Sequence, residues 1–264
     1  MHISVNCPSY KRPKVETLDY LPFCKVWVCE TEAEAYRAAN PGREDNIIPC
    51  KVGIQGNLCR IRNHILDTEF AAGADVVLLI DDDLRAVEYF EPEPGSRFGY
   101  MKHKVLPEEF LQFIERYSRL CAEFGFLFWG LNCNKDAMSY SHQTPFSTVS
   151  YIGGPFQCFL RGNECRYDEA LPLKEDYDMT LQNCNKYRGC LRVNKYHYNV
   201  RQAEQAGGCA TYRNYSHEEQ QLNALRAKWG SRIVRIDKSN KGKTKKEKVK
   251  IDFNPIIKVP IKGV

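Results

Sequence analysis

The chain has 264 residues, enough for one large domain or two small ones, and its 43% hydrophobic and 27% charged content is ordinary for a water-soluble globular protein. No apolar run approaches the roughly 18 residues of a membrane-spanning helix. The opening "MHISVNCPSYKRP" lacks a signal peptide's apolar stretch, so we expect a cytoplasmic protein without membrane insertion. Charge is uneven: residues 226–264 carry 13 Lys/Arg against 3 Asp/Glu, whereas the rest carries 25 against 30.

In chain order, the pattern predicts alternating strands and helices. Strands are expected at 3–7, 25–30, 46–52 and 75–80, and helices at 32–40 and 56–73. Residues 91–150 are expected to add a connector, a helix and a buried strand, and residues 236–264 a basic hairpin or tail with a late strand. This β-α-β-α-β order indicates a parallel sheet wrapped by helices, in which ligands bind beyond the carboxyl ends of the strands.

The twelve cysteines form no CxxC pair, and several lie in apolar segments, such as Cys29 in "KVWVCE". Such residues behave as small buried hydrophobic groups. We therefore expect reduced thiols without a zinc site. The basic C-terminal segment indicates a polyanionic partner, nucleic acid or an acidic membrane surface, or else a solvated tail.

Three consecutive acids, Asp81, Asp82 and Asp83, follow the apolar run of residues 76–80. One interpretation is a turn in which Asp83 caps a helix starting at Leu84. The other is a site for Mg²⁺ or Mn²⁺, which prefer carboxylate oxygens and substrate phosphates. The cations of the preceding helix and of the loop "CPSYKRP" would suit a diphosphate, and they favour the second interpretation.

The segments "VNCPSYKRP" and "GNLCRIRNHILDTEFAAGADVVLLIDDDL" resemble the nucleotide-sugar half of GT-A glycosyltransferases of the family-2 type, over about the first 90 residues. The resemblance implies an α/β, Rossmann-like fold: a mixed, mostly parallel sheet flanked by helices, with a basic C-terminal extension. It implies a transferase domain over 1–235, divided into a nucleotide-sugar half (1–90) and an acceptor half (91–235), followed by the tail 236–264.

The same resemblance implies a UDP-sugar donor and assigns residues to it. Pro8, Ser9 and Arg12 would line the nucleoside pocket, and Glu30 would lie near the base. Arg62, Asn63, Asp81 and Asp82 would complete the donor site, with Asp81 near the ribose. Asp83, together with Asp81, would hold Mn²⁺ or Mg²⁺, which offsets charge on the departing diphosphate. His197 would be a third metal ligand and His217 its alternative, unless either is a structural histidine.

The segment "YIGGPFQCFLRGNECRYDEALPLKEDYDMTLQNCNKYRG" resembles the acceptor half of these enzymes. In that motif an acid ahead of a helix is the catalytic base: Asp176 here, with Glu175 as the alternative. An acceptor hydroxyl needs a carboxylate to take its proton, although acids at a helix start can also serve the helix dipole. Gly153, Gly154 and Phe156 would contact the acceptor.

The segment "RQAEQAGGCATYRNYSHEEQQLNALRAKWGSRIVRI" and its basic tail resemble the glycosyltransferases associated with TET/JBP-type oxygenases, phage and related enzymes that glycosylate hydroxymethylated pyrimidines in DNA. This implies a DNA acceptor, with Lys243, Lys245 and Lys246 contacting phosphates. A flipped base would stack on Tyr151, Phe156 or Tyr177, or else these aromatic residues belong to the core.

The resulting hypothesis is a metal-dependent enzyme that transfers glucose from UDP-glucose to 5-hydroxymethylcytosine in DNA, with inversion. Three alternatives remain: a family-2 transferase acting on a glycan or lipid-linked acceptor, a nucleotidyltransferase, and a non-enzymatic DNA-binding module. The first loop, "NCPSYKRP", lacks the glycine-rich pattern of nucleotidyltransferases, and the retained acids argue against the third alternative.

Overall fold

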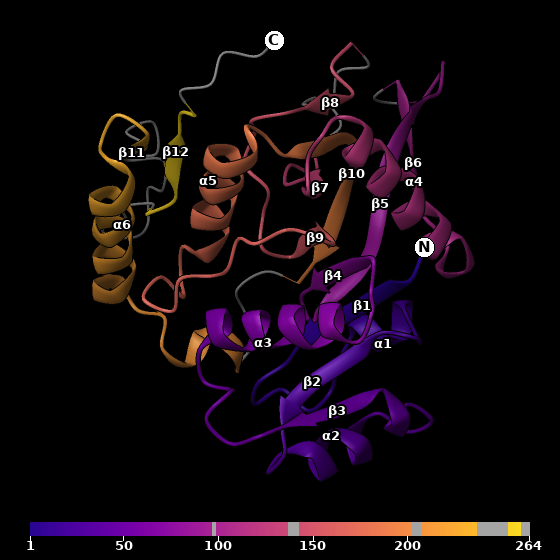
Figure 1. The fold of residues 1–264 in the computed structure, drawn as a ribbon. Coiled ribbons are helices and arrows are strands. Elements are labelled where there is room, and N and C mark those ends of the chain that lie inside the picture. The colour runs from indigo at the N-terminus through magenta and orange to yellow at the C-terminus, as the bar shows by residue number, and fades with distance from the viewer. Residues whose placement is uncertain (97–98, 137–142, 202–206, 237–252, 260–264) are drawn as a thin grey trace, which may run out of the picture.

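The computed structural model describes residues 1–96, 99–136, 143–201, 207–236 and 253–259 (Figure 1). The strands are β1 Ile3–Pro8, β2 Lys25–Cys29, β3 Ile47–Cys50, β4 Val76–Ile80, β5 Leu84–Pro92, β6 Tyr100–Lys104, β7 Phe128–Asn132, β8 Phe146–Ser147, β9 Phe156–Leu160, β10 Leu191–Val200, β11 Val234–Ile236 and β12 Pro255–Ile257. The α-helices are α1 Thr17–Tyr20, α2 Ala33–Ala39, α3 Leu58–Ala71, α4 Phe110–Glu123, α5 Glu175–Tyr187 and α6 Tyr215–Trp229, with short 3₁₀ turns η1 Glu44–Asn46, η2 Pro107–Glu109 and η4 Gly208–Thr211.

Within the described residues, ten strands form one mixed sheet in the order β3-β2-β1-β4-β9-β7-β10-β5-β6, with β8 paired to β10. The first four strands of this order are parallel to one another. Strands β9, β5 and β8 run against the direction shared by the other seven. The predicted fold class, a mixed and mostly parallel sheet flanked by helices, is confirmed. So are the strands and helices expected in the first 80 residues.

Strand β4 is buried on both faces, and its side chains alternate between two cores. Val76, Leu78 and Ile80 join the core that includes α4 and α1, whereas Val77 and Leu79 join the core that includes α3 and α5. This alternation follows from the two-residue period of a strand. It explains why the central strand is a continuous apolar run.

A smaller core lies on the outer side of α5, where α6 and the β11–β12 pair are found (Figure 1). Strand β11 pairs antiparallel with β12, so residues 234–236 and 255–257 of the basic C-terminal segment lie side by side. Residues 237–252 between them lie outside the described residues. All twelve cysteines are free thiols, ten of them buried, as predicted. Among the described residues, no helix is long and apolar enough to cross a membrane.

The acid triplet forms the turn between β4 and β5. Since β5 begins at Leu84, the interpretation of Asp83 as a helix cap is wrong. The buried hydroxyl of Thr17 closes this turn: it donates to the carbonyl oxygen of Asp81 at 2.7 Å and accepts from the amide of Leu84 at 2.9 Å. The amide of Thr17 donates to the carbonyl oxygen of Asp82 at 3.2 Å. Helix α1 therefore positions the triplet.

We predict that Thr17→Val lowers the free energy of unfolding by about 1–3 kcal/mol. Valine keeps the shape but leaves a buried amide and a buried carbonyl without their hydroxyl partner. Chemical denaturation measures the change. Thr17→Ser is the matched control, because it keeps the hydroxyl and should lose less. Equal losses in both variants would show that the methyl group, rather than the hydroxyl, stabilises the turn.

Candidate active site

A cavity of about 390 Å³ opens where β1, β4 and β10 end and α5 begins. Five segments line it: the loop after β1, the start of α3 with the residues before it, the acid triplet, residues 151–155 together with the start of α5, and parts of 198–213. The sequence places these segments far apart. The carboxyl ends of parallel strands bring them together, which is where α/β sheets bind ligands.

The loop after β1 is anchored to the acid triplet through Asp82. The carboxylate of Asp82 accepts from the hydroxyl of Ser9 at 2.6 Å and pairs with the guanidinium of Arg12. Tyr36 supports the loop, with its hydroxyl 2.9 Å from the hydroxyl of Ser9 and accepting from the amide of Arg12 at 3.0 Å. Pro8, Ser9 and Arg12 all line the cavity, and so does Asp82. The carboxylate of Asp82 thus holds the loop in place.

The guanidinium of Arg62 is buried between the triplet and helix α5, with only 1% of its side chain exposed. Its Nη2 donates to Asp81 at 3.0 Å and to the carbonyl oxygen of Gly154 at 3.1 Å, and its Nη1 donates to Glu175 at 3.2 Å. The guanidinium carbon lies 5.5 Å from the ring centroid of Tyr167. One arginine therefore joins the donor-side and acceptor-side acids that the sequence singled out.

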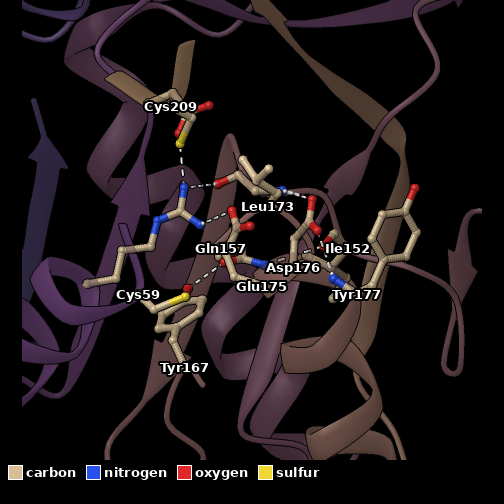
Figure 2. A network of polar contacts seen from close by, with 12 residues as sticks. Cys59, Ile152, Gln157, Tyr167, Leu173, Glu175, Asp176, Tyr177 and Cys209 are labelled. Carbon is tan, nitrogen blue, oxygen red and sulfur yellow. Dashed lines mark hydrogen bonds and ion pairs between the residues drawn. The ribbon is translucent and has the colours of Figure 1, made fainter. Parts of the chain in front are cut away.

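Glu175 is buried beside Asp176 at the start of α5 (Figure 2). Burial, and next the negative charge of Asp176, raise the pKa of Glu175 to about 8, and Arg62 opposes this rise. The contact with Arg62 engages the carboxyl group of Glu175 within the protein. Glu175 lines the cavity but is tied to that internal pair.

Asp176 is more open than Glu175 and its carboxylate is oriented by three donors. Its Oδ2 accepts from the hydroxyl of Tyr151 and from the amide of Gly154 at 3.2 Å, and its Oδ1 accepts from the amide of Tyr177 at 2.8 Å. The rings of Tyr151 and Tyr177 stack, with centroids 4.2 Å apart and planes 16° from parallel. Asp176 and Tyr151 line the cavity together. A carboxylate held in this way has the geometry of a general base.

Asp83 also lines the cavity, and no side chain in the described part of the chain donates to its carboxylate. Burial, followed by the charges of Asp81 and Asp82, raises the pKa of Asp83 to about 7. No group of three or more His, Cys, Asp or Glu side chains arranged to hold a metal occurs among the described residues. Mg²⁺ and Mn²⁺ take one or two carboxylates and complete their shell with water and substrate phosphates, and Asp83 beside Asp81 fits that donor set.

Two of the residues predicted for the donor site do not line the cavity. Glu30 is exposed after β2, where its carboxylate accepts from the amide of Val52 at 3.0 Å. Asn63 is bonded to the backbone of Tyr167 through both its amide nitrogen and its oxygen, each at 2.8 Å. Asn63 therefore holds the tyrosine on which Arg62 rests. Successive residues of an α-helix point in directions about 100° apart. Asn63 therefore points away from the cavity that its neighbour Arg62 lines.

Neither histidine proposed for the metal lies at the cavity. Tyr198 and Val200 of β10 line it, so the intervening alternation turns His197 to the opposite face of the sheet. There His197 is buried and its Nε2 lies 3.4 Å from a carboxylate oxygen of Glu88. His217 is exposed in the first turn of α6.

Of the residues predicted to contact the acceptor, some line the cavity and others do not. Gly154 lines the cavity, but Phe156 is fully buried against Trp129, with ring centroids 5.5 Å apart. Gly153 packs under Tyr198, whose hydroxyl would lie 2.2 Å from an added Cβ. Lys243, Lys245 and Lys246 lie outside the described residues.

Several lining residues had no assigned role in the sequence: Gln55, Tyr198, Arg201, Cys209, Tyr212 and Arg213. The last three belong to the stretch "GGCATYR", which lies in the segment that resembles the TET/JBP-associated glycosyltransferases and whose residues had no assigned roles. Its two consecutive glycines were the available signal, since paired glycines mark turns and close approaches of the backbone, although they do not tell which segment is approached. In the structure both have positive φ, and Gly207 approaches the first loop closely.

We predict that Glu175→Gln changes how stability depends on pH. Glu175 is protonated in both states below its usual value of 4.5 and ionised in both above about 8, so its contribution is present at low pH and lost as pH rises through that window. The free energy of unfolding of the variant, relative to the wild-type protein, should therefore increase between pH 5 and 8. Urea denaturation at three pH values measures this. Glu169→Gln, which also replaces one carboxylate but at an exposed position, is the matched control. A flat difference for Glu175→Gln would contradict the assignment.

The model of the TET-Associated Glycosyltransferase family matches residues 21–208. Among solved structures, the chain is similar to A197 from STIV, with 11% identity and a TM-score of 0.41 over 78% of this chain and 88% of that one. It is similar to S. aureus TarS 1-349 in complex with UDP, with 14% identity and a TM-score of 0.43 over 86% of this chain and 66% of that one. A Desulfovibrio desulfuricans G20 protein described as a nucleotide-diphospho-sugar transferase matches with 11% identity and a TM-score of 0.41, over 86% and 97%.

Comparison with curated proteins found no significant match. The family model nevertheless spans more than half of the chain, including the acid triplet, the buried arginine and the start of α5. The protein belongs to the TET-associated glycosyltransferase family and is a glycosyltransferase.

Proposed function

We propose that the protein transfers a hexose, with glucose as the first choice, from a UDP-sugar to 5-hydroxymethylcytosine or a related hydroxymethylpyrimidine in DNA. The observation that carries this proposal is that one cavity holds both an acid triplet and the oriented carboxylate of Asp176. A transferase needs these two functions side by side: a place for the donor diphosphate and a base for the acceptor hydroxyl.

The donor is expected on the side of the loop after β1. Pro8, Ser9 and Arg12 line this part of the cavity together with Gln55, and the triplet lies next to them. A divalent cation on Asp83 and Asp81 would stabilise negative charge on the leaving diphosphate. Asp82 and Arg62 are bonded to other groups within the protein. Asp83 is therefore the acid of the triplet that is left facing the cavity.

The acceptor is expected beside Asp176. As its hydroxyl oxygen bonds to the anomeric carbon of the sugar, the bond from that carbon to the UDP oxygen breaks and Asp176 receives the hydroxyl proton. The new bond forms on the face opposite the leaving group, so an α-linked donor gives a β-linked product. Two effects supply the rate enhancement: the base takes the proton of the hydroxyl group, and the protein positions the donor and the acceptor next to each other.

Two features favour a base in DNA over other acceptors. The family's name associates it with TET oxygenases, whose connection with hydroxymethylated pyrimidines the sequence resemblance already implied. Tyr151 places an aromatic ring at the cavity wall and its hydroxyl on Asp176. A flipped pyrimidine can stack on such a ring, and the basic C-terminal segment could contact the phosphates on either side.

The test is to incubate the protein and Mn²⁺ with hydroxymethylated DNA and a panel of UDP-sugars, followed by nucleoside mass spectrometry. We expect a hexosylated hydroxymethylcytosine from the wild-type protein and at least about 100-fold less from Asp176→Asn, which removes the base. Binding of UDP should persist in the variant. Glu169→Gln, an exposed acid nearby in the sequence, is the control. Near-normal transfer by Asp176→Asn would refute the role of the base, and the absence of a hexosylated base with every UDP-sugar of the panel would refute the DNA acceptor.

We also predict that Asp83→Asn abolishes transfer and weakens Mn²⁺-dependent UDP binding by at least about tenfold, because an amide is a poorer ligand for a hard cation than a carboxylate. Calorimetric titration of UDP with and without Mn²⁺ measures this effect, and thermal unfolding checks that the fold is kept. Full activity of the wild-type protein in EDTA would exclude the proposed metal role.

A further inference from the structure

A chain of charged side chains connects the start of α5 with the cavity through α6. Lys174, which directly precedes Glu175, is only 2% exposed, and its Nζ lies 2.5 Å from Oε2 of Glu218. The other oxygen of Glu218 lies 3.0 Å from Nε of Arg213. Arg213 is half-exposed and lines the cavity. One carboxylate thus serves two cations, and the three groups together carry a net positive charge.

Two of the other arginines of the cavity are more fully paired than Arg213. Arg62 is held by two acids and Arg12 pairs with Asp82. Arg201 lies 3.1 Å from Glu16, but Glu16 also pairs with Arg85 at 2.7 Å. Glu218 likewise already balances the buried Lys174, since an unpaired buried ammonium is costly. Among these four arginines, Arg213 and Arg201 are therefore less neutralised than Arg12 and Arg62.

The balance of charge in the cavity calls for such a group. Five carboxyl groups and four arginines are among its described lining residues, and Arg12 and Arg62 are already engaged by three of these carboxyl groups. A diphosphate adds further negative charge. It binds favourably where a cation faces it, and the planar guanidinium is suited to two hydrogen bonds with phosphate oxygens.

The backbone holds Arg213 at the donor side. The amide of Gly208 donates to the carbonyl oxygen of Tyr10 at 2.8 Å, and Gly207 has φ +97° with room for no side chain, because a Cβ would lie 2.6 Å from the carbonyl oxygen of Lys11. This close approach fixes residues 207 onward against the loop after β1. Asn214 then caps α6 by accepting from the amide of His217 at 2.9 Å, so Arg213 is held between two ordered elements.

We propose that Arg213 binds the diphosphate of the donor nucleotide and that Glu218, itself held by Lys174, is its positioning residue. This inference rests on the proposed function, since it takes a nucleoside diphosphate to be the ligand. The shared chemistry is a phosphate group, which the DNA backbone also carries, so the experiment must distinguish the two sources.

The experiment measures binding of UDP, uridine and a hydroxymethylated duplex to the full chain, with and without Mn²⁺. In Arg213→Gln we expect the Kd for UDP to rise about tenfold or more, the loss of one charge-assisted contact, while the Kd for uridine is unchanged. Arg213→Lys should restore part of the loss. Glu218→Gln should weaken UDP binding in the same direction by a smaller factor, again without changing uridine binding.

Arg119→Gln is the matched control, because Arg119 pairs with a single acid on α4 and does not line the cavity. Unchanged UDP affinity in Arg213→Gln would overturn the inference, as would equal losses for UDP and uridine. A loss confined to duplex binding would also overturn it and assign the phosphate to DNA. The proposed function fails separately: if the wild-type protein binds UDP but modifies no DNA, a diphosphate-specific loss in Arg213→Gln still supports the inference.

Discussion

The site depends on the contacts that the buried guanidinium of Arg62 makes with acids from two distant segments. Five acids surround this part of the cavity, and without a cation among them their mutual repulsion and their burial would oppose folding. Arg62 contacts one acid of the β4–β5 turn and one of α5, which the sequence separates by more than ninety residues. Its charge is itself taken out of water, and several bonds compensate for that cost. The distance between the donor and acceptor sides of the site is therefore determined inside the protein, before any ligand enters.

The same principle separates the roles of the three consecutive aspartates. Asp81 pairs with Arg62, and Asp82 pairs with Ser9 and Arg12, so both stabilise neighbouring segments. Asp83 is left facing the cavity, with a pKa raised to about 7 by burial and by its two neighbours. A bound cation would stabilise the ionised form of this carboxylate, as the arginines stabilise the ionised forms of the other two. Identical residues thus acquire different chemistry from where their partners lie.

The sequence predicted the elements that depend on local pattern. The apolar run of β4 has only one good interpretation, and strands of a parallel sheet end at a common edge, so Asp81, Arg62 and Asp176 could be expected to meet. His197 was misplaced because a strand presents alternate residues to opposite faces, and the register of β10 is not readable without its partners. Asn63 was assigned to the donor site together with Arg62, but it is the next residue on helix α3 and points in another direction. Arg213 lies on an irregular segment with no period, so only the three-dimensional packing of Gly207 and Gly208 against the first loop reveals its place.

Exposure gives a physical reason to divide the arginines by role. A guanidinium that is 1% exposed and surrounded by the protein's own acceptors, as Arg62 is, has little left to offer a ligand. One that is half-exposed and shares a carboxylate with a buried lysine, as Arg213 does, is less fully neutralised and remains accessible from the cavity. The first kind positions acids, and the second is suited to attract anions. Because Lys174 directly precedes Glu175 and Asp176 in the sequence, the proposed anion binding at Arg213 and the orientation of the Asp176 carboxylate depend on the same turn of α5.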